Sequence, residues 1–161
     1  MTRIAILIIF ANLAISCKQT PGSLTSKQIS DVQDSVKVLA DSIATHVSLE
    51  GPAAWLRYFE NSPDFFMASE GQLVFPNIDS AKNFVTSTLV KTYRSIELHW
   101  SNIRVVPVTS QFAVLAANYH EDATYSDGKK LPSDGYFTGM AHQTNKGWKL
   151  QNAHWSSIVT H

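Results

Sequence analysis

The sequence predicts one α+β domain in which about six mostly antiparallel strands pack against three helices. Its first half is helical, because apolar residues recur every three or four positions from Ile29 to Val47. Its second half holds four consecutive β-rich runs separated by short breaks, at 95–108, 111–125, 136–144 and 148–159. Helices that are segregated from such a run of strands are typical of an α+β sandwich.

The first predicted helix begins after Thr25 and carries its apolar stripe for about 20 residues. Thr25 and Gln28 have the spacing of a capping box, which satisfies free N–H groups at a helix start. Gly51 breaks the pattern, and Pro52 suits the first position of a second helix. That second helix, predicted over 53–60, is rich in aromatic residues and must be mostly buried.

Two short strand-like runs follow, at 65–68 and 73–75, and their closeness predicts a hairpin. Pro76 and Asp79 then begin a third helix, which ends before Tyr93. From there the periodicity is that of strands to the end of the chain.

The composition of the chain excludes several classes of function. The chain has 161 residues, enough for one domain, with 13 Lys and Arg residues balancing 13 Asp and Glu residues. A neutral chain lacks the basic surface with which proteins bind nucleic acid. A single cysteine permits neither an internal disulfide nor a zinc cage. The 44% hydrophobic content indicates a packed globular domain.

The N-terminus has the pattern of an export signal. Arg3 precedes an apolar run at 4–11, and the apolar stretch as a whole is too short for a stable membrane span, which needs about 20 residues. Ser16 and Cys17 follow, an arrangement that resembles a bacterial lipobox, although Ala14 stands where leucine is usual. An ordinary signal peptide with an incidental cysteine is the alternative interpretation.

This resemblance implies that residues 1–16 are a lipoprotein signal peptide and that Cys17 carries the lipid. Residues 17–24 would then be a flexible tether, and 25–161 the domain. Acyl chains would hold the protein at a membrane, since each buried methylene contributes about 0.8 kcal/mol. The expected location is the cell envelope, facing the periplasm or the cell surface.

The order of elements and the last strands resemble the SnoaL-like, nuclear transport factor 2-like superfamily. The motifs that carry the resemblance lie at 111–116, 134–139, 146–150 and 154–156. The resemblance implies a cone-shaped fold whose open end holds an apolar pocket, and open sheets that pair as homodimers. Members include isomerases, cyclases, dehydratases and binding proteins. Steroid-isomerase members use an acidic base from the early strands, and the run 67–69 (Met-Ala-Ser) contains none.

Alternation along the last strand predicts the site. Trp148 and Leu150 mark the inward face, so Asn152, His154 and Ser156 should line the same wall. His154 is the candidate general base, and its alternative role is a buried histidine that hydrogen-bonds a neighbouring strand.

The strand before it supplies the remaining catalytic candidate. Tyr136 is the candidate hydrogen-bond donor, with ordinary strand packing as its alternative role. Met140 and His142 share its face by the same count. The other pocket candidates are aromatic or polar residues from four further positions: Trp55, Tyr58, His99 and Asn118. The consecutive residues 120–122 (His-Glu-Asp) fit a solvated strand end.

Three functions are compatible with these residues. The first is binding of a small, largely apolar molecule in the pocket. The second is an isomerase, cyclase or hydratase that uses His154 as base, and the third is a dimeric interaction module. No histidine spacing predicts a metal site, and no motif predicts a cofactor.

Overall fold

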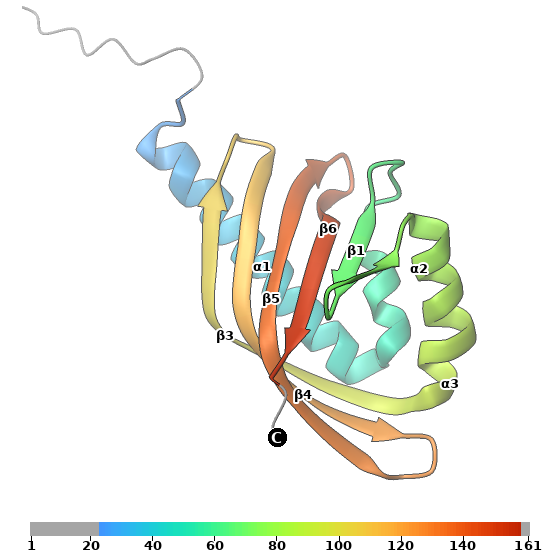
Figure 1. The fold of residues 1–161 in the computed structure, drawn as a ribbon. Helices are drawn as coiled ribbons and strands as arrows, with labels where there is room; N and C mark the ends of the chain where they lie inside the picture. The colour runs from blue at the N-terminus through green and yellow to red at the C-terminus, as the bar shows by residue number, and fades with distance from the viewer. Residues whose placement is uncertain (1–22, 159–161) are drawn as a thin grey trace, which may run out of the picture.

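The computed structural model describes residues 23–158. The predicted signal peptide, Cys17 and most of the predicted tether lie outside these residues. The described part begins with helix α1 and ends with strand β6 (Figure 1).

Helix α1 spans Ser26–Glu50 and begins with the predicted capping box. The Thr25 hydroxyl accepts a hydrogen bond from the Gln28 N–H at 3.2 Å, and the Gln28 carboxamide accepts one from the Thr25 N–H at 2.9 Å. Its buried stripe comprises Val32, Val36, Leu39, Ala40, Ile43 and Val47. No helix among residues 23–158 is both long enough and apolar enough to cross a membrane.

The connecting elements follow the predicted order with one difference. The second helix is a 3₁₀ turn, η1 (Pro52–Arg57), shorter than the predicted helix over 53–60. Strands β1 (Phe66–Ser69) and β2 (Gln72–Phe75) form the predicted hairpin. Helices α2 (Ile78–Phe84), η2 (Val85–Leu89) and α3 (Val90–Thr92) follow one another without a break, and η2 is a π-helical turn between the two α-helical pieces.

Four long strands complete the chain: β3 (Tyr93–Pro107), β4 (Phe112–Tyr125), β5 (Lys130–Thr144) and β6 (Gly147–Ser157). They join the hairpin in one six-stranded sheet of order β2-β1-β6-β5-β4-β3. Neighbouring strands are antiparallel except β1 and β6, which pair in parallel. The α+β class and the mostly antiparallel sheet are therefore confirmed.

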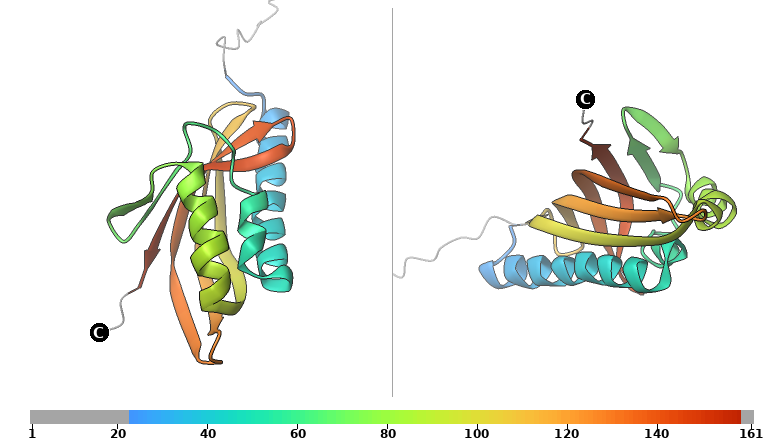
Figure 2. Two further views of the ribbon diagram at one scale, coloured as in Figure 1. Left: turned by 90° about the vertical axis from the view of Figure 1, so that its right-hand side faces the viewer. Right: turned by 90° about the horizontal axis from the view of Figure 1, so that it is seen from below.

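The sheet is strongly curved. Helix α1 crosses one face, and the far ends of β3, β4 and β5 bend toward the α2–α3 segment (Figures 1 and 2). Seen from below, sheet, α1 and α2–α3 enclose the interior from three sides (Figure 2). We call the α1-facing side of the sheet the inner face and the opposite side the outer face.

Helix α1 forms hydrogen bonds to the edge strand β3. The Trp100 indole N–H donates to the Ala40 carbonyl at 2.9 Å, and the Leu98 N–H donates to the Ser48 hydroxyl at 2.9 Å. An uncovered edge would present free N–H and C=O groups to other chains. These bonds therefore hold α1 at a defined position under the sheet.

The core lies between α1 and the inner face. Its largest fully buried side chains include Ile43, Leu98, Leu115, Phe137 and Leu150. Burial of each such side chain contributes about 1.5–3 kcal/mol relative to exposure. The core occupies the part of the interior under α1, and a cavity remains near the α2–α3 segment.

Candidate ligand-binding cavity

A cavity of about 580 Å³ lies between the β1–β2 hairpin, the α2–α3 segment and the inner face at the curved end of the sheet. Its wall is mainly apolar and aromatic; the aromatic residues are Trp55, Phe59, Phe75, Phe84, Tyr93, Tyr119 and Trp155. Val74, Phe84 and Leu131 line it with side chains that are 38% to 42% exposed, so solvent reaches the cavity beside them. This volume suits a small organic molecule.

The most distinctive polar group of the cavity is the carboxyl group of Glu121, from the middle of β4. Across the sheet, Glu121 is paired with Leu98 on one side and with Ser133 on the other. Burial in these surroundings raises the pKa of Glu121, because the charged form loses water. Within residues 23–158, no hydrogen bond or ion pair to this carboxyl group is found. Glu121 therefore presents to the cavity a titratable carboxyl group without a hydrogen-bond partner among the described residues.

Two tyrosines lie on either side of Glu121 in the cavity wall. The Tyr119 hydroxyl is 3.1 Å from the Ser157 hydroxyl. Tyr93 stacks on Tyr125 with ring centroids 4.9 Å apart. Burial, the hydrogen bond to Tyr125 and the nearby Glu121 all raise the pKa of Tyr93, so it is a neutral hydrogen-bonding group at ordinary pH.

The structure places Trp55, one of the predicted pocket residues, in the cavity wall, and its contact with a ligand stays a prediction. Tyr58 is buried but does not line the cavity. Its hydroxyl hydrogen-bonds to His46 and donates to the Ser42 carbonyl at 3.0 Å. Burial raises the pKa of Tyr58, and these bonds tie η1 to α1.

The predicted inward face of the last strand is wrong from Asn152 onward, and the cause is a β-bulge. Leu150 pairs with Ala141, but Asn152 pairs with Met140, so Gln151 is left without a partner. One extra residue exchanges the two faces of a strand. Ala153, Trp155 and Ser157 point inward in place of Asn152, His154 and Ser156, which lie on the outer face.

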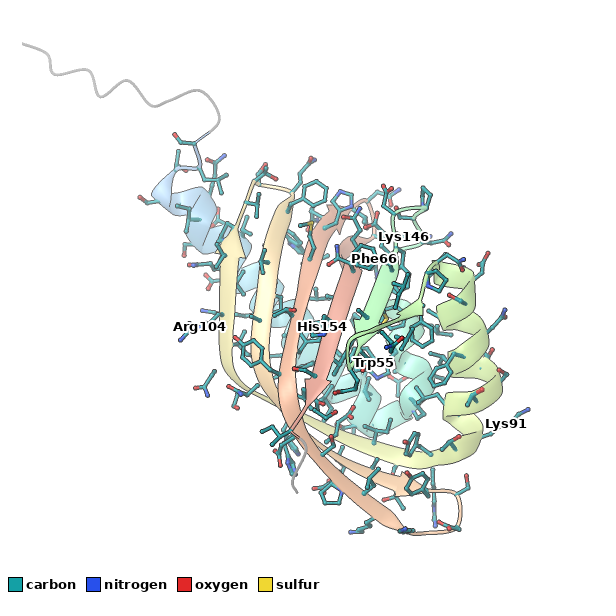
Figure 3. All side chains as sticks on the ribbon, viewed as in Figure 1. Trp55, Phe66, Lys91, Arg104, Lys146 and His154 are labelled. Carbon is teal, nitrogen blue, oxygen red and sulfur yellow. The ribbon has the colours of Figure 1, made fainter. Side chains whose placement is uncertain are left out.

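His154 is exposed and borders a shallow hollow of about 200 Å³ on the outer face, together with Asn152 and Met140. Figure 3 shows His154 on the side of β6 turned away from α1. Ser156 donates a hydrogen bond to the Tyr136 carbonyl at 3.3 Å. Catalysis by His154 stays a prediction. It assumed that His154 lines the cavity wall, and the His154 side chain does not lie there.

The other predicted strand residues also lie away from the cavity. Tyr136 is 39% exposed on the outer face, and His99 is exposed on the same face. The Asn118 carboxamide accepts a hydrogen bond from Asn102 at 3.1 Å. Trp148 does face inward, where it packs against the core without reaching the cavity.

His142 forms a contact of its own at the opposite end of β5. Its Nδ1 lies 3.0 Å from both Glu60 carboxylate oxygens, and its ring stacks on Phe112 with centroids 4.2 Å apart. The histidine and glutamate side chains are only 25% and 14% exposed. This pair joins the segment after η1 to the sheet and does not border the cavity.

Glu121 was the functional candidate that the sequence interpretation missed, because 120–122 resembled a solvated strand end. Strand β4 has no register shift against β5, so a strict alternation of faces continues through Leu115, Ala117 and Tyr119 to Glu121. Counting from the apolar residues of β4 would therefore have found it. No cluster of three His, Cys, Asp or Glu residues suited to a metal ion occurs in the part of the chain that the structure describes.

No family model matches the chain, and no curated protein matches its sequence. Solved structures do match its fold. A nuclear transport factor 2-like superfamily protein from Salmonella enterica superimposes with a TM-score of 0.69 at 18% identity, over 81% of this chain and 94% of that chain. A hexachlorocyclohexane dehydrochlorinase from Novosphingobium barchaimii gives 0.67 at 10% identity, over 84% and 92% of the two chains.

A ketosteroid isomerase-like protein from Erwinia carotovora atroseptica gives a TM-score of 0.61 at 13% identity, over 80% of this chain and 97% of that chain. Identities this low show the fold and carry no activity from one protein to another.

Proposed function

We propose that this chain, which has a nuclear transport factor 2-like fold with an open apolar cavity, binds one small, largely apolar molecule in that cavity. The observation that supports binding is the composition of the wall, which is aromatic and aliphatic with a few polar groups. Sites for small molecules combine these features, with the polar groups orienting the ligand.

The uncharged fluorescent probe N-phenyl-1-naphthylamine tests this proposal, since Trp55 and Trp155 in the cavity wall would transfer energy to it. Ser133→Trp places a large ring in the cavity and should weaken probe binding at least about tenfold. Tyr136→Trp introduces the same indole ring, in place of a phenol ring, on the outer face of the same strand and should leave binding unchanged. Equal binding by the two variants would exclude the cavity as the site.

We also propose that the protein is exported and anchored to a membrane through lipidated Cys17, which lies outside the described residues. Support comes from the N-terminal sequence pattern alone. After expression in a bacterium that processes lipoproteins, the native protein should partition into the detergent phase of Triton X-114. Cys17→Ser should move it to the aqueous phase. A native protein in the aqueous phase would contradict the anchor.

A second candidate function is enzymatic proton transfer, of isomerase, cyclase or hydratase type. Glu121 supports it better than His154, because its carboxyl group lies in the cavity with a raised pKa. A general base contributes roughly 10²–10⁴-fold to a rate. For any substrate that the native protein turns over, Glu121→Gln should reduce kcat by that factor, while its affinity for N-phenyl-1-naphthylamine stays within about twofold of the native value. His154→Ala should retain activity toward the same substrate. Full activity of Glu121→Gln would refute this role.

A homodimer through the outer face is the remaining proposal. That face exposes several large apolar side chains: Phe66, Val106, Val114 and Tyr136. Val114→Glu puts a charge beside the shallow hollow and should convert a dimer into a monomer in sedimentation velocity. Val38→Glu, at an exposed position of α1, is the matched control. A native protein that sediments as a monomer would exclude the dimer.

A further inference from the structure

The cavity holds a carboxyl group without a counter-charge. Glu121 lies between Leu98 and Ser133 across the sheet, and Tyr119 and Ala123 are its neighbours on the same face of β4. Among the described residues that line the cavity, none is a lysine, arginine or histidine. The other titratable groups facing the cavity are Tyr93 and Tyr119, which are also acids. No cationic side chain among residues 23–158 therefore neutralises ionised Glu121 from the cavity wall.

The walls around this carboxyl group are suited to a cation. Tyr93 and Tyr119 line the cavity close to Glu121 along the sheet, and Trp155 lines it further away, from β6, which is separated from β4 by β5. The face of an aromatic ring attracts an organic cation, by about 0.5–2 kcal/mol depending on how far water is excluded. One anionic group set among aromatic rings is a favourable environment for a protonated amine with an apolar body.

We propose that the cavity selects a lipophilic amine, whose ammonium group pairs with the Glu121 carboxylate while its hydrocarbon or aromatic body fills the space between the rings. This inference rests on the proposed binding function and adds the chemical class of the ligand. A neutral carbonyl compound is the competing ligand, because a protonated Glu121 could donate a hydrogen bond to it. The two classes differ in how charge and pH affect their binding.

A matched set of probes tests the inference. The compounds 1-naphthylmethylamine, 1-naphthylmethanol and 1-naphthoic acid share one ring system and are respectively cationic, neutral and anionic at about pH 8. Each competes with N-phenyl-1-naphthylamine for the native protein. We expect the amine to bind at least tenfold more tightly than the alcohol, and the acid to bind weakest. The preference for the amine should fall as the pH is lowered and Glu121 takes up a proton.

Glu121→Gln keeps the shape of the side chain and removes its charge, so the amine and the alcohol should then bind within about twofold of each other. Glu97→Gln removes a carboxylate from the outer face of β3 and should keep the preference. The inference fails if the alcohol equals the amine on the native protein, or if the preference survives Glu121→Gln. If no probe binds, including N-phenyl-1-naphthylamine, the proposed cavity binding fails as well.

Discussion

The ring of Tyr119 lies directly over Gly135, its partner on the neighbouring strand β5. A Cβ atom at Gly135 would lie 2.6 Å from the Tyr119 ring and 2.1 Å from the backbone oxygen of Ser156. Both distances are far below van der Waals contact. Glycine at this position therefore lets β4, β5 and β6 approach one another beside the cavity, where the Tyr119 hydroxyl meets Ser157.

Gly135→Ala should consequently destabilise the fold by roughly 1–3 kcal/mol, the usual cost of overpacking. Urea unfolding monitored by tryptophan fluorescence measures the change. Thr138→Ala, on the outer face of the same strand, is the control and should cost less. Since the nearest atom belongs to the β6 backbone, adding Tyr119→Ala should not restore stability. Full rescue by that second substitution would show that the ring alone excludes the methyl group.

The raised pKa of Glu121 predicts the pH dependence of stability. The folded protein holds this proton more tightly than the unfolded chain, so stability falls as pH rises through the interval between the two pKa values. Glu121→Gln removes the titrating group and therefore this loss of stability. The variant should be as stable as the native protein at low pH and more stable than it at neutral pH. Thermal unfolding of both proteins across pH measures the difference, with Glu97→Gln as control. A difference that stays constant with pH would contradict this prediction.

The sequence predicts the local elements well because their causes are local. The capping box at Thr25 needs only Gln28 three residues later, and the stripe of α1 needs only a regular period. The start of β5 is different. It begins at Lys130 and not at the predicted Tyr136, because pairing with β4 extends the strand through Pro132, a residue that disfavours strands.

The site is harder to predict because one inserted residue determines which side chains face the cavity. The bulge at Gln151 has no signature in the sequence, yet it moves His154 to the outer face. Strand β4 contains no bulge against β5, so simple alternation would have placed Glu121 correctly. The parallel pairing of β1 with β6 joins segments distant in the chain, and no local pattern encodes it.

The contacts of His120 on the outer face predict a second pH-dependent contribution to stability. Its Nδ1 lies 2.8 Å from Asp134 and its Nε2 lies 3.3 Å from Asp122, and the hydrogen bond to Asp134 is the main cause of its raised pKa. Asp134→Asn should lower this pKa, measured from the ring Cε1–H signals in an NMR titration. Asp41→Asn, at an exposed position of α1, is the control.

The sign of the linked stability follows from the same contact. A raised histidine pKa stabilises the fold below the ordinary histidine pKa, and this stabilisation is lost as pH rises through the folded value. Asp134→Asn should therefore destabilise the protein more at about pH 5.5 than at about pH 8.5. The opposite order would show that Asp134 supports the fold independently of the charge on His120.

Substitutions in the pair formed by His142 and Glu60 distinguish a structural role of His142 from a role in ligand binding. His142→Phe keeps a ring that can stack on Phe112 but leaves the largely buried Glu60 carboxylate without its partner, at a cost of about 1–3 kcal/mol. Glu60→Gln can still hydrogen-bond to His142, so it should cost less. Urea unfolding measures both changes.

Binding of N-phenyl-1-naphthylamine by folded His142→Phe should stay within about twofold of the native affinity, because His142 does not border the cavity. Leu131→Ala, at an exposed position of the cavity wall, provides a variant that should alter affinity more than stability. His142→Phe should therefore lower stability more than affinity, and Leu131→Ala should alter affinity more than stability. Weakened probe binding by His142→Phe at unchanged stability would return His142 to the ligand site predicted from the sequence, and would require a second binding region beside Glu60.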